Sequence, residues 1–269
     1  MSSFDQVTTW TPTGPGAFAG AVPVDWGQGR SAFGGVTTAA ACRAMGTLVA
    51  PGRTLRSFST SLVGPVRLGD PVELTAQVLR EGRSLTHTEA RLVQGGQVVA
   101  VALGAFGGPR ASGVAVRPAT RPSGLPAPEA CTSFPYLSGI TPAFTQHMEM
   151  RWTHGSLPFG GCDESVIGLF LRHRTAASGA EAIIGLLDTP PSPVLQMLQG
   201  PAPASTVRWS AHLLQVPALD DGAWCWLHSE ARSAGEGYGT MLGSLYGPDG
   251  SLIAWTEQLV CIFDGGATG

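Results

Sequence analysis

The sequence contains no lysine, so all 16 of its basic residues are arginines. This absence excludes a P-loop lysine, a Schiff-base lysine and a lysine general base, and with them several classes of enzyme. Charge is scarce in general, because charged residues make up only 13% of the chain and no run of basic residues is present. Nucleic-acid-binding proteins carry a basic patch or stripe, so the sequence argues against such a role.

Cysteines and long apolar runs are also scarce. The five cysteines are scattered without a C-x-x-C pair, so we interpret them as small buried residues in a reducing compartment rather than as a zinc or redox site. The longest apolar runs, such as VIGLFL, fall far short of the ~20 residues that cross a bilayer, and the N-terminus lacks the pattern of a signal peptide. We therefore expect a cytoplasmic protein that uses no membrane, metal or cofactor.

Residues 107–142 are rich in Gly, Pro, Ala and Ser and show neither the period of a strand nor that of a helix. They predict a linker between two folded units, residues 1–106 and 143–269. Both units close with a strand, a glycine-containing hairpin turn and a second strand, in RLVQGGQVVAVALGAF of the first and SLYGPDGSLIAWTEQLV of the second.

Each unit also offers one helix ahead of its main run of strands. In the first unit the segment is GGVTTAAACRAMGTLV, and in the second it opens at LLDTPPSPVLQML. One helix followed by a meander of antiparallel strands, present twice, predicts an α+β fold in which a curled sheet wraps a helix in each unit.

The last strand, LIAWTEQLVCIF, contains three adjacent polar residues. Alternation places Thr256 and Gln258 on one face, and Glu257 on the other. When the closing hairpins of the two units are aligned on their turn glycines, Gln258 matches Gly104 of the first unit. An amide added to only one copy suggests a functional role, although a wet position at the rim of the sheet would also account for it.

Two further polar residues have both a structural and a functional interpretation. Asp188 follows the run AIIGLL and precedes TPPSPVLQML, which suits the N-cap of a helix with proline in its first turn. A carboxylate there would also suit general-base work, with the helix dipole favouring ionisation and burial opposing it. In STVRWSAHLL, alternation places Thr206 on the face opposite Trp209, and strand propensity alone would explain a threonine.

The segments LLD (186–188), STVRWS (205–210) and DGSLIAWTEQLV (249–260) together resemble the type II acyl-CoA thioesterases, a double-hotdog family. The Gly-Gly helix opening in AFGGV and the strand QHMEMRW extend the resemblance. It implies a double hotdog fold, hydrolysis of acyl-CoA to fatty acid and CoA, and a homodimer or homotetramer. In that family an aspartate, a threonine or serine, and a glutamine of the second unit activate one water. Matched by position, these catalytic roles fall on Asp188, Thr206 and Gln258.

The resemblance also implies where the substrate binds. We expect Gly34 and Gly35 at the helix opening to contact it and Trp209 to line an apolar acyl tunnel. The candidate ligands of the CoA phosphates are three arginines of the second unit, Arg151, Arg172 and Arg174, which the sequence does not rank. Some neighbouring residues depart from the family pattern: Val36 replaces a glutamine after Gly-Gly, and Arg208 with Trp209 replaces an Asp-His pair. These departures leave the three implied catalytic residues in place and indicate a different substrate preference.

Three other functions would need different sequence features. A serine nucleophile would need G-x-S-x-G, and the nearest segment, GRSAF, has Phe33 in place of the second glycine. A hotdog hydratase often carries an aspartate followed five positions later by histidine, and no aspartate here has that neighbour. A non-catalytic protein that binds acyl-CoA or an acyl chain remains open: the departures favour it, and the presence of all three polar residues favours the enzyme.

Overall fold

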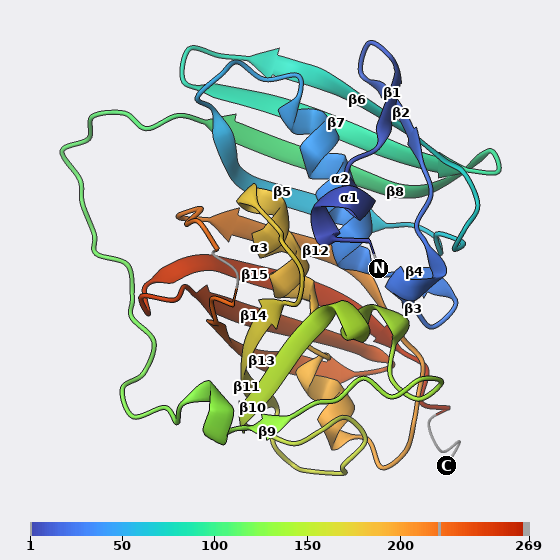
Figure 1. Ribbon diagram of the computed structural model, residues 1–269, viewed down its shortest axis with the longest axis vertical. Helices are drawn as coiled ribbons and strands as arrows, with labels where there is room; N and C mark the ends of the chain where they lie inside the picture. The colour runs from blue at the N-terminus through green and yellow to red at the C-terminus, as the bar shows by residue number, and fades with distance from the viewer. Residues whose placement is uncertain (1, 220–221, 266–269) are drawn as a thin grey trace.

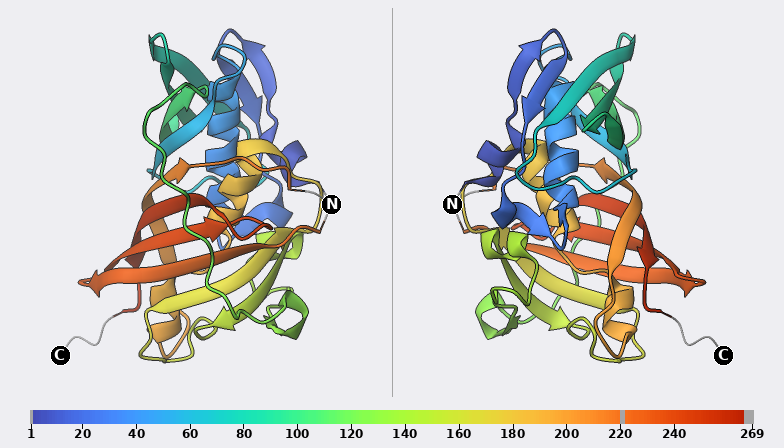
Figure 2. Two further views of the ribbon diagram at one scale, coloured as in Figure 1. Left: turned by 90° about the vertical axis from the view of Figure 1, so that its left-hand side faces the viewer. Right: turned by 90° about the vertical axis from the view of Figure 1, so that its right-hand side faces the viewer.

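The computed structural model describes residues 2–219 and 222–265. Its main element is an antiparallel sheet of 13 strands in the order β1-β2-β6-β7-β8-β5-β12-β15-β14-β13-β11-β10-β9. This sheet curls around the helices α2 and α3 (Figures 1 and 2). The architecture confirms the predicted α+β fold with a sheet wrapped around one helix in each half.

The elements of the two halves follow each other in a similar order. The first half contributes α1 (Phe4–Thr8), β1 (Thr11–Gly14), β2 (Ala17–Gly20), the 3-10 helix η1 (Val24–Trp26), β3 (Gly27–Gln28), β4 (Ser31–Ala32), α2 (Gly34–Gly46), β5 (Thr54–Leu62), β6 (Val72–Glu81), β7 (Leu85–Gln94) and β8 (Gln97–Gly107). The second half contributes η2 (Pro128–Ala130), β9 (Thr132–Ser133), η3 (Ala143–His147), β10 (Met148–His154), β11 (Val166–His173), α3 (Gly179–Asp188), η4 (Pro193–Met197), β12 (Ala204–Leu213), β13 (Cys225–Gly235), β14 (Tyr238–Tyr246) and β15 (Leu252–Ile262).

Strands β5 and β12 join the two halves into one continuous sheet. They pair antiparallel from Ser61 opposite Arg208 to Ser57 opposite His212. On either side of this pair the strand order repeats in reverse, β8-β7-β6 on one side and β15-β14-β13 on the other. The halves are thus related by an approximate two-fold axis between β5 and β12, and α2 packs against α3 on the inner side of the sheet.

Helix α2 is buried all round, as a helix enclosed by a sheet must be. Of its 13 residues, 11 are buried, and many are Gly, Ala or Thr. Such small side chains let the sheet and α3 approach closely. The predicted helix of the first half is therefore confirmed.

The second helix differs from the prediction. The run AIIGLL is helical, and Asp188 is the last residue of α3 rather than a cap at the start of a helix. Pro190 and Pro191 follow after one residue, Thr189, and proline ends helices because it has no N–H group to donate to the preceding turn. The predicted helical segment beyond them forms the short 3-10 helix η4.

The first 33 residues carried no predicted element, and they form α1 and β1 to β4. Strands β1 and β2 join the large sheet, whereas β3 and β4 pair with each other in a separate two-stranded sheet. The segment VIGLFLRH, which ends at His173, forms β11. Within residues 107–142, β9 pairs with β10, and Thr120 forms a bridge with Ser251. This segment therefore contacts the second half at these two places as it runs along it (Figure 1).

Candidate active site

The structure brings Asp188, Thr206 and Gln258 together, although 70 residues separate Asp188 from Gln258. The Gln258 Nε2 atom donates a hydrogen bond of 3.0 Å to Asp188 Oδ1. The Thr206 hydroxyl donates to Gln258 Oε1 at 3.5 Å, the long limit of such a bond. The three side chains come from the end of α3, from β12 and from β15, and the amide of Gln258 lies between the other two.

A β-bulge gives Thr206 its orientation, and here the simple alternation fails. The register of β12 against β15 shifts at Val207, so that Thr206 pairs with Val260 and Trp209 pairs with Gln258. Because Val260 and Gln258 lie two residues apart on one strand, Thr206 and Trp209 share a face instead of lying on opposite faces. The extra residue thus turns the Thr206 hydroxyl toward Gln258.

Asp188 meets the start of α2, which belongs to the other half of the chain. A Cβ atom on Gly34 would lie only 2.8 Å from Asp188 Oδ2, and the Gly35 backbone N–H donates to the carboxylate. The positive end of the α2 dipole therefore favours the ionised form of Asp188, while the negative end of its own helix α3 opposes it. The sequence predicted that Asp188 lies at the start of a helix. Its carboxylate does lie at a helix start, but the helix is α2 of the first half.

Burial raises the pKa of Asp188 from 3.8 to about 7, and the hydrogen bonds from Gln258 and Gly35 lower it only in part. Asp188 as a whole residue is half-buried. A general base works best when its pKa lies near the working pH, so Asp188 suits proton abstraction at neutral pH.

A cleft adjoins Gln258 on the inner side of the second half. Including solvent at its mouth, it has a volume of about 300 Å³. Its walls come from the end of α3 and the segment after it, and from the inner faces of β13, β14 and β15. The lining residues are Leu187, Pro190, Pro191, Leu227, Ser229, Met241, Gly243, Thr256 and Gln258.

The first half does not repeat this arrangement at the matching position. Gly104 aligns with Gln258, and a Cβ atom there would lie 2.8 Å from Phe106, 3.0 Å from Thr88 and 3.1 Å from Met45. These side chains leave no room for an amide at that position. The difference between the two copies that singled out Gln258 in the sequence is therefore a difference in packing.

Two residues predicted to contact substrate lie elsewhere. Trp209 is completely buried, and its indole Nε1 donates to Thr256 Oγ1 at 2.6 Å, so it holds a residue of the cleft wall instead of lining the cleft itself. Arg151 lies on β10 between two residues that point into the core, which places it on the outer face, where it donates to Glu149 at 3.0 Å. The sheet separates Arg151 from Asp188. Gly34 and Gly35, by contrast, lie against Asp188 as described above.

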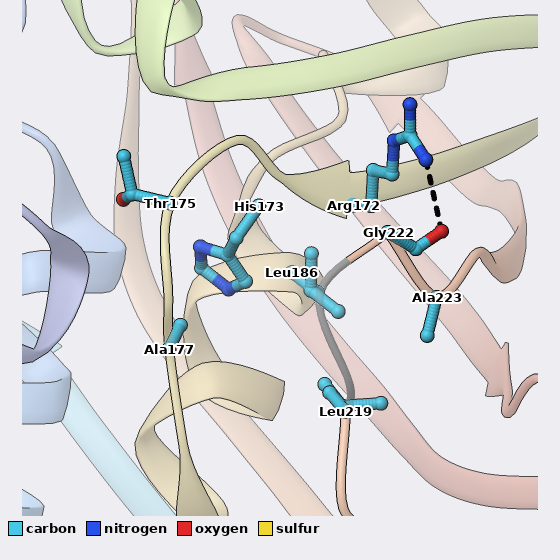
Figure 3. A pocket seen from close by; sticks show the side chains of 8 residues that line it. All are labelled: Arg172, His173, Thr175, Ala177, Leu186, Leu219, Gly222 and Ala223. Carbon is cyan, nitrogen blue, oxygen red and sulfur yellow. Dashed lines mark hydrogen bonds between the residues drawn. The ribbon is translucent and has the colours of Figure 1, made fainter.

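A second pocket lies between the end of β11 and the segment after β12 (Figure 3). Arg172 donates to the carbonyl of Gly222 at 2.9 Å and also binds Glu149. Burial lowers the pKa of His173 to about 4, so its imidazole is neutral at pH 7. The pocket contains none of the three predicted catalytic residues; its lining is Arg172, His173, Thr175, Ala177, Leu186, Leu219, Gly222 and Ala223.

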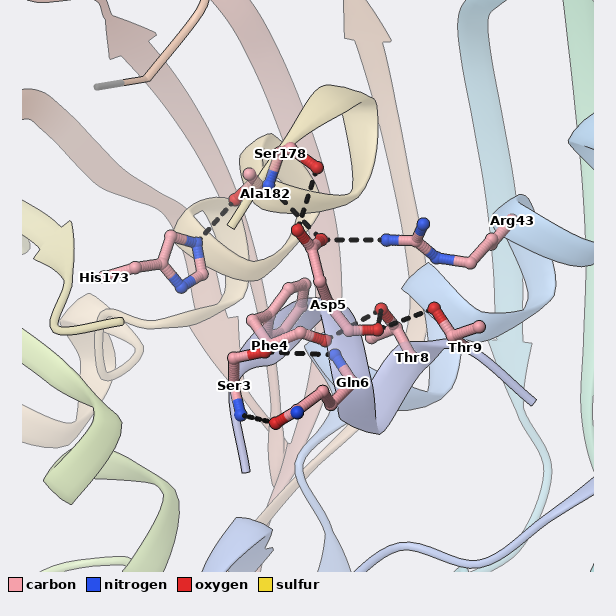
Figure 4. A network of polar contacts seen from close by, with 10 residues as sticks. All are labelled: Ser3, Phe4, Asp5, Gln6, Thr8, Thr9, Arg43, His173, Ser178 and Ala182. Atoms are coloured by element: carbon pink, nitrogen blue, oxygen red, sulfur yellow. Dashed lines mark hydrogen bonds and ion pairs between the residues drawn. The ribbon is translucent and has the colours of Figure 1, made fainter. Parts of the chain in front are cut away.

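Helix α1 binds the opposite end of the α2–α3 pair, where Figure 4 shows its contacts. Asp5 accepts hydrogen bonds from Arg43 Nη2 at 3.0 Å and from the hydroxyl of Ser178 at 2.8 Å. Its carboxylate also accepts from the Ser178 backbone N–H at 3.3 Å, at the start of α3. Asp5 thus meets the start of α3 as Asp188 meets the start of α2, and α1 occupies the counterpart of the Asp188 position under the approximate two-fold axis.

Replacing Asp5 by alanine is expected to lower the free energy of unfolding by about 1–3 kcal/mol, because Arg43 and Ser178 lose their shared acceptor. Chemical denaturation measures this loss. Asp70→Ala is the matched control, because Asp70 and its partner Arg67 are 51% and 60% exposed and such surface pairs contribute less than about 1 kcal/mol. Equal losses in the two variants would contradict a clamping role for Asp5.

Within residues 2–219 and 222–265, no helix has the length and hydropathy needed to span a membrane. In the same part of the chain, no group of three or more His, Cys, Asp or Glu side chains could hold a metal ion.

Solved structures share this fold over nearly the whole chain. A conserved protein of unknown function with a hot dog fold from Alicyclobacillus acidocaldarius has a TM-score of 0.83 and 24% identity, covering 96% of this chain and 97% of that one. A candidate thioesterase II from Thermobifida fusca has a TM-score of 0.82 and 18% identity, with 97% and 98% covered. The TesB protein of Mycobacterium avium subspecies paratuberculosis has a TM-score of 0.80 and 17% identity, with 96% and 98% covered. No curated protein matches the chain.

Family models match both halves. The acyl-CoA thioesterase C-terminal domain matches residues 128–262, and the acyl-CoA thioesterase N-terminal domain matches residues 22–107. The first match alone covers half of the chain, and the two follow each other in the order of the folded halves. The chain therefore belongs to the acyl-CoA thioesterase family, and it is a thioester hydrolase with a double hotdog fold.

Proposed function

We propose that this protein hydrolyses acyl-CoA to the free acid and CoA with a water molecule held and activated by Asp188, Thr206 and Gln258. The observation that carries this proposal is the contact of all three side chains around one amide. Gln258 donates to Asp188 at 3.0 Å, and Thr206 reaches the other end of the same amide at 3.5 Å. The cleft beside them has a mostly apolar lining, which suits an acyl chain.

Thioester hydrolysis requires a base and a positioned water, and the thioester carbonyl carbon is already a reactive electrophile. Asp188 takes a proton from the water as the water oxygen attacks the carbonyl carbon of the thioester. The tetrahedral intermediate then expels the CoA thiolate, which takes up a proton, so that water and thioester yield acid and thiol. No covalent acyl-enzyme forms. An amide and a hydroxyl suit the positioning task, because neither competes with Asp188 for the proton.

The surroundings of Asp188 support its role as the base. Loss of solvation raises its pKa to about 7, which makes the carboxylate a stronger base than one in water. The start of α2 keeps enough of it ionised at neutral pH to accept a proton. Both halves of the chain are therefore needed for the proposed site, since α2 comes from the first and all three polar side chains come from the second.

The alternatives make different demands on the site. A hydratase would use a histidine with a carboxylate, and no histidine lines the cleft. A non-catalytic binding protein would hold acyl-CoA without releasing thiol. Release of free thiol from a panel of acyl-CoA esters therefore tests the proposal, and binding without turnover of any ester would favour the binding protein.

Thr206→Val is expected to lower kcat/KM about tenfold, because valine keeps the shape of threonine but loses one hydrogen bond to the water or to Gln258. Thiol release from the acyl-CoA that is turned over fastest measures the change. Ser205→Ala removes the neighbouring, exposed hydroxyl and should leave the rate unchanged. A Thr206→Val variant with the wild-type rate would remove Thr206 from the proposed site.

A further inference from the structure

Five of the 16 arginines gather at one end of the first half. The β6–β7 turn, the start of β5 and the end of β8 meet there, because Gly107 pairs with both Thr54 and Leu85. Residues 107–142 leave the large sheet from this end (Figure 1). The sequence shows no basic run, because the five arginines come from three separate segments. They form the basic end of the molecule: Arg53 and Arg56, Arg80 and Arg83, and Arg110.

The positive charge of the basic end is not balanced. Its three segments, residues 52–56, 80–87 and 107–110, contain one acidic residue, Glu81, whose carboxylate lies 3.6 Å from Arg53. Arg53 and Arg56 also donate to backbone carbonyls at 2.8 and 2.9 Å, which fixes the guanidinium groups without cancelling their charge. Five positive charges and one negative give this end a formal charge of +4, whereas the whole protein carries −3.

Three of these arginines are available to a partner. Arg80, Arg83 and Arg110 are exposed, and within residues 2–219 and 222–265 none of their guanidinium groups forms an ion pair. A guanidinium group presents several N–H donors in one plane, and this geometry fits the oxygens of a phosphate group. The basic end therefore suits a surface that carries phosphates.

Two aliphatic side chains are exposed beside these arginines. The pairing of β6 with β7 shifts between Val78 and Arg80, so Leu79 is the extra residue of a β-bulge. Leu79 is 50% exposed and Val78 is 39% exposed. A lipid bilayer offers phosphates at its surface and an apolar phase just below, so it can contact both kinds of side chain. A nucleic acid offers the phosphates but no apolar phase for Leu79.

The basic end and the candidate active site lie at opposite ends of β5. This strand begins at Thr54, and it ends at Leu62, whose Cδ1 atom would be 3.3 Å from a Cβ atom on Gly34. Its nine residues span roughly 26 Å at about 3.3 Å per residue. We propose that the basic end binds the surface of an anionic lipid bilayer, with Arg80, Arg83 and Arg110 on headgroup phosphates and Leu79 inserted beneath them.

Sedimentation with lipid vesicles tests this proposal. The wild type should bind phosphatidylcholine vesicles that contain about 30% phosphatidylglycerol but not pure phosphatidylcholine vesicles, and NaCl raised from about 50 to 500 mM should release it. Arg80→Gln/Arg83→Gln should weaken binding about 25-fold, because each arginine near an anionic surface contributes about fivefold. Leu79→Gln should weaken binding about fivefold without a change of charge.

Arg67→Gln/Arg91→Gln is the matched control. Both residues are exposed and lie outside the basic end, so this variant loses the same charge and should bind vesicles as the wild type does. Thiol release from butyryl-CoA without vesicles should be the same in all variants, which shows that they are folded.

Binding to neither kind of vesicle, equal binding to both, or equal losses in the two double variants would overturn the proposal. A loss of affinity for a DNA duplex with normal vesicle binding in Arg80→Gln/Arg83→Gln would assign the basic end to nucleic acid instead. A raised KM for butyryl-CoA in the same variant would assign it to the CoA phosphates. Because vesicle binding needs no turnover, each of these results leaves the proposed function standing.

Discussion

Asp188→Asn is expected to lower kcat for acyl-CoA hydrolysis by about 10²–10⁴-fold and to leave the fold intact. Asparagine has nearly the same shape and keeps an oxygen that accepts from Gln258 and Gly35, but it cannot take a proton from water. The variant also removes a carboxyl whose ionisation is opposed by burial. We therefore expect its melting temperature at pH 8 to equal or exceed that of the wild type. Thiol release and thermal unfolding, measured on the same samples, check the two expectations.

Glu257→Gln provides the control for this change. Glu257 adjoins Gln258 in β15, but it is exposed on the other face of the strand, so the same chemical substitution there should leave kcat unchanged. Equal activity of Asp188→Asn and the wild type would show that another group activates the water.

The activity of the wild type should rise about tenfold per pH unit below pH 7 and level off above it. The raised pKa of Asp188, about 7, is the cause, because only the ionised carboxylate accepts the proton. A profile of log kcat/KM against pH, from about 5 to 9, measures this. A profile that is flat down to pH 5 would contradict a base with the pKa of Asp188.

The same raised pKa links stability to pH, with a definite sign. In the unfolded chain an aspartate titrates near 3.8, and in the folded chain Asp188 titrates near 7, so the folded state binds its proton more tightly. This contribution is fully present below about pH 4, is lost as the pH rises toward 7, and stays constant above it. The full shift corresponds to about 4 kcal/mol, and because Asp188 is only half-buried we expect a loss of about 2–3 kcal/mol.

Denaturation of the wild type and of Asp188→Asn at pH 5 and pH 8 isolates this contribution. The loss of stability between the two values should be smaller in the variant, because asparagine does not titrate. Identical pH dependence in the two proteins would show that burial does not raise the pKa of Asp188.

The periodic parts of the fold could be predicted from the sequence, and the ambiguous parts could not. The hairpins that end in β8 and β15 combine alternating residues with glycine turns, which is a strong local signal. The run AIIGLL is too short and too apolar for its period to separate helix from strand. In addition, the Pro-Pro pair after Asp188 is compatible with either a helix start or a helix end, and the structure has the end.

The candidate site, like the fold, could be predicted from the sequence only in part. Comparing the two copies singled out Gln258, because an amide replaces Gly104. The orientation of Thr206 was not predictable, since a bulge at Val207 leaves no mark on the hydrophobic pattern. Nor was the contact of Asp188 with Gly35, because it joins residues far apart in the chain that meet only when both helices are packed.

The position that α1 occupies through Asp5 has a consequence for how the two halves can diverge. In a dimer of identical subunits, each with a single hotdog unit, the two helix starts would be equivalent. A segment that covered one of them would therefore also cover the other. Covalent fusion breaks that coupling, so one location can be sealed by the N-terminal helix while the other keeps an accessible carboxylate. We therefore expect one reaction centre per polypeptide. The end of the helix pair that α1 covers then serves only to stabilise the fold.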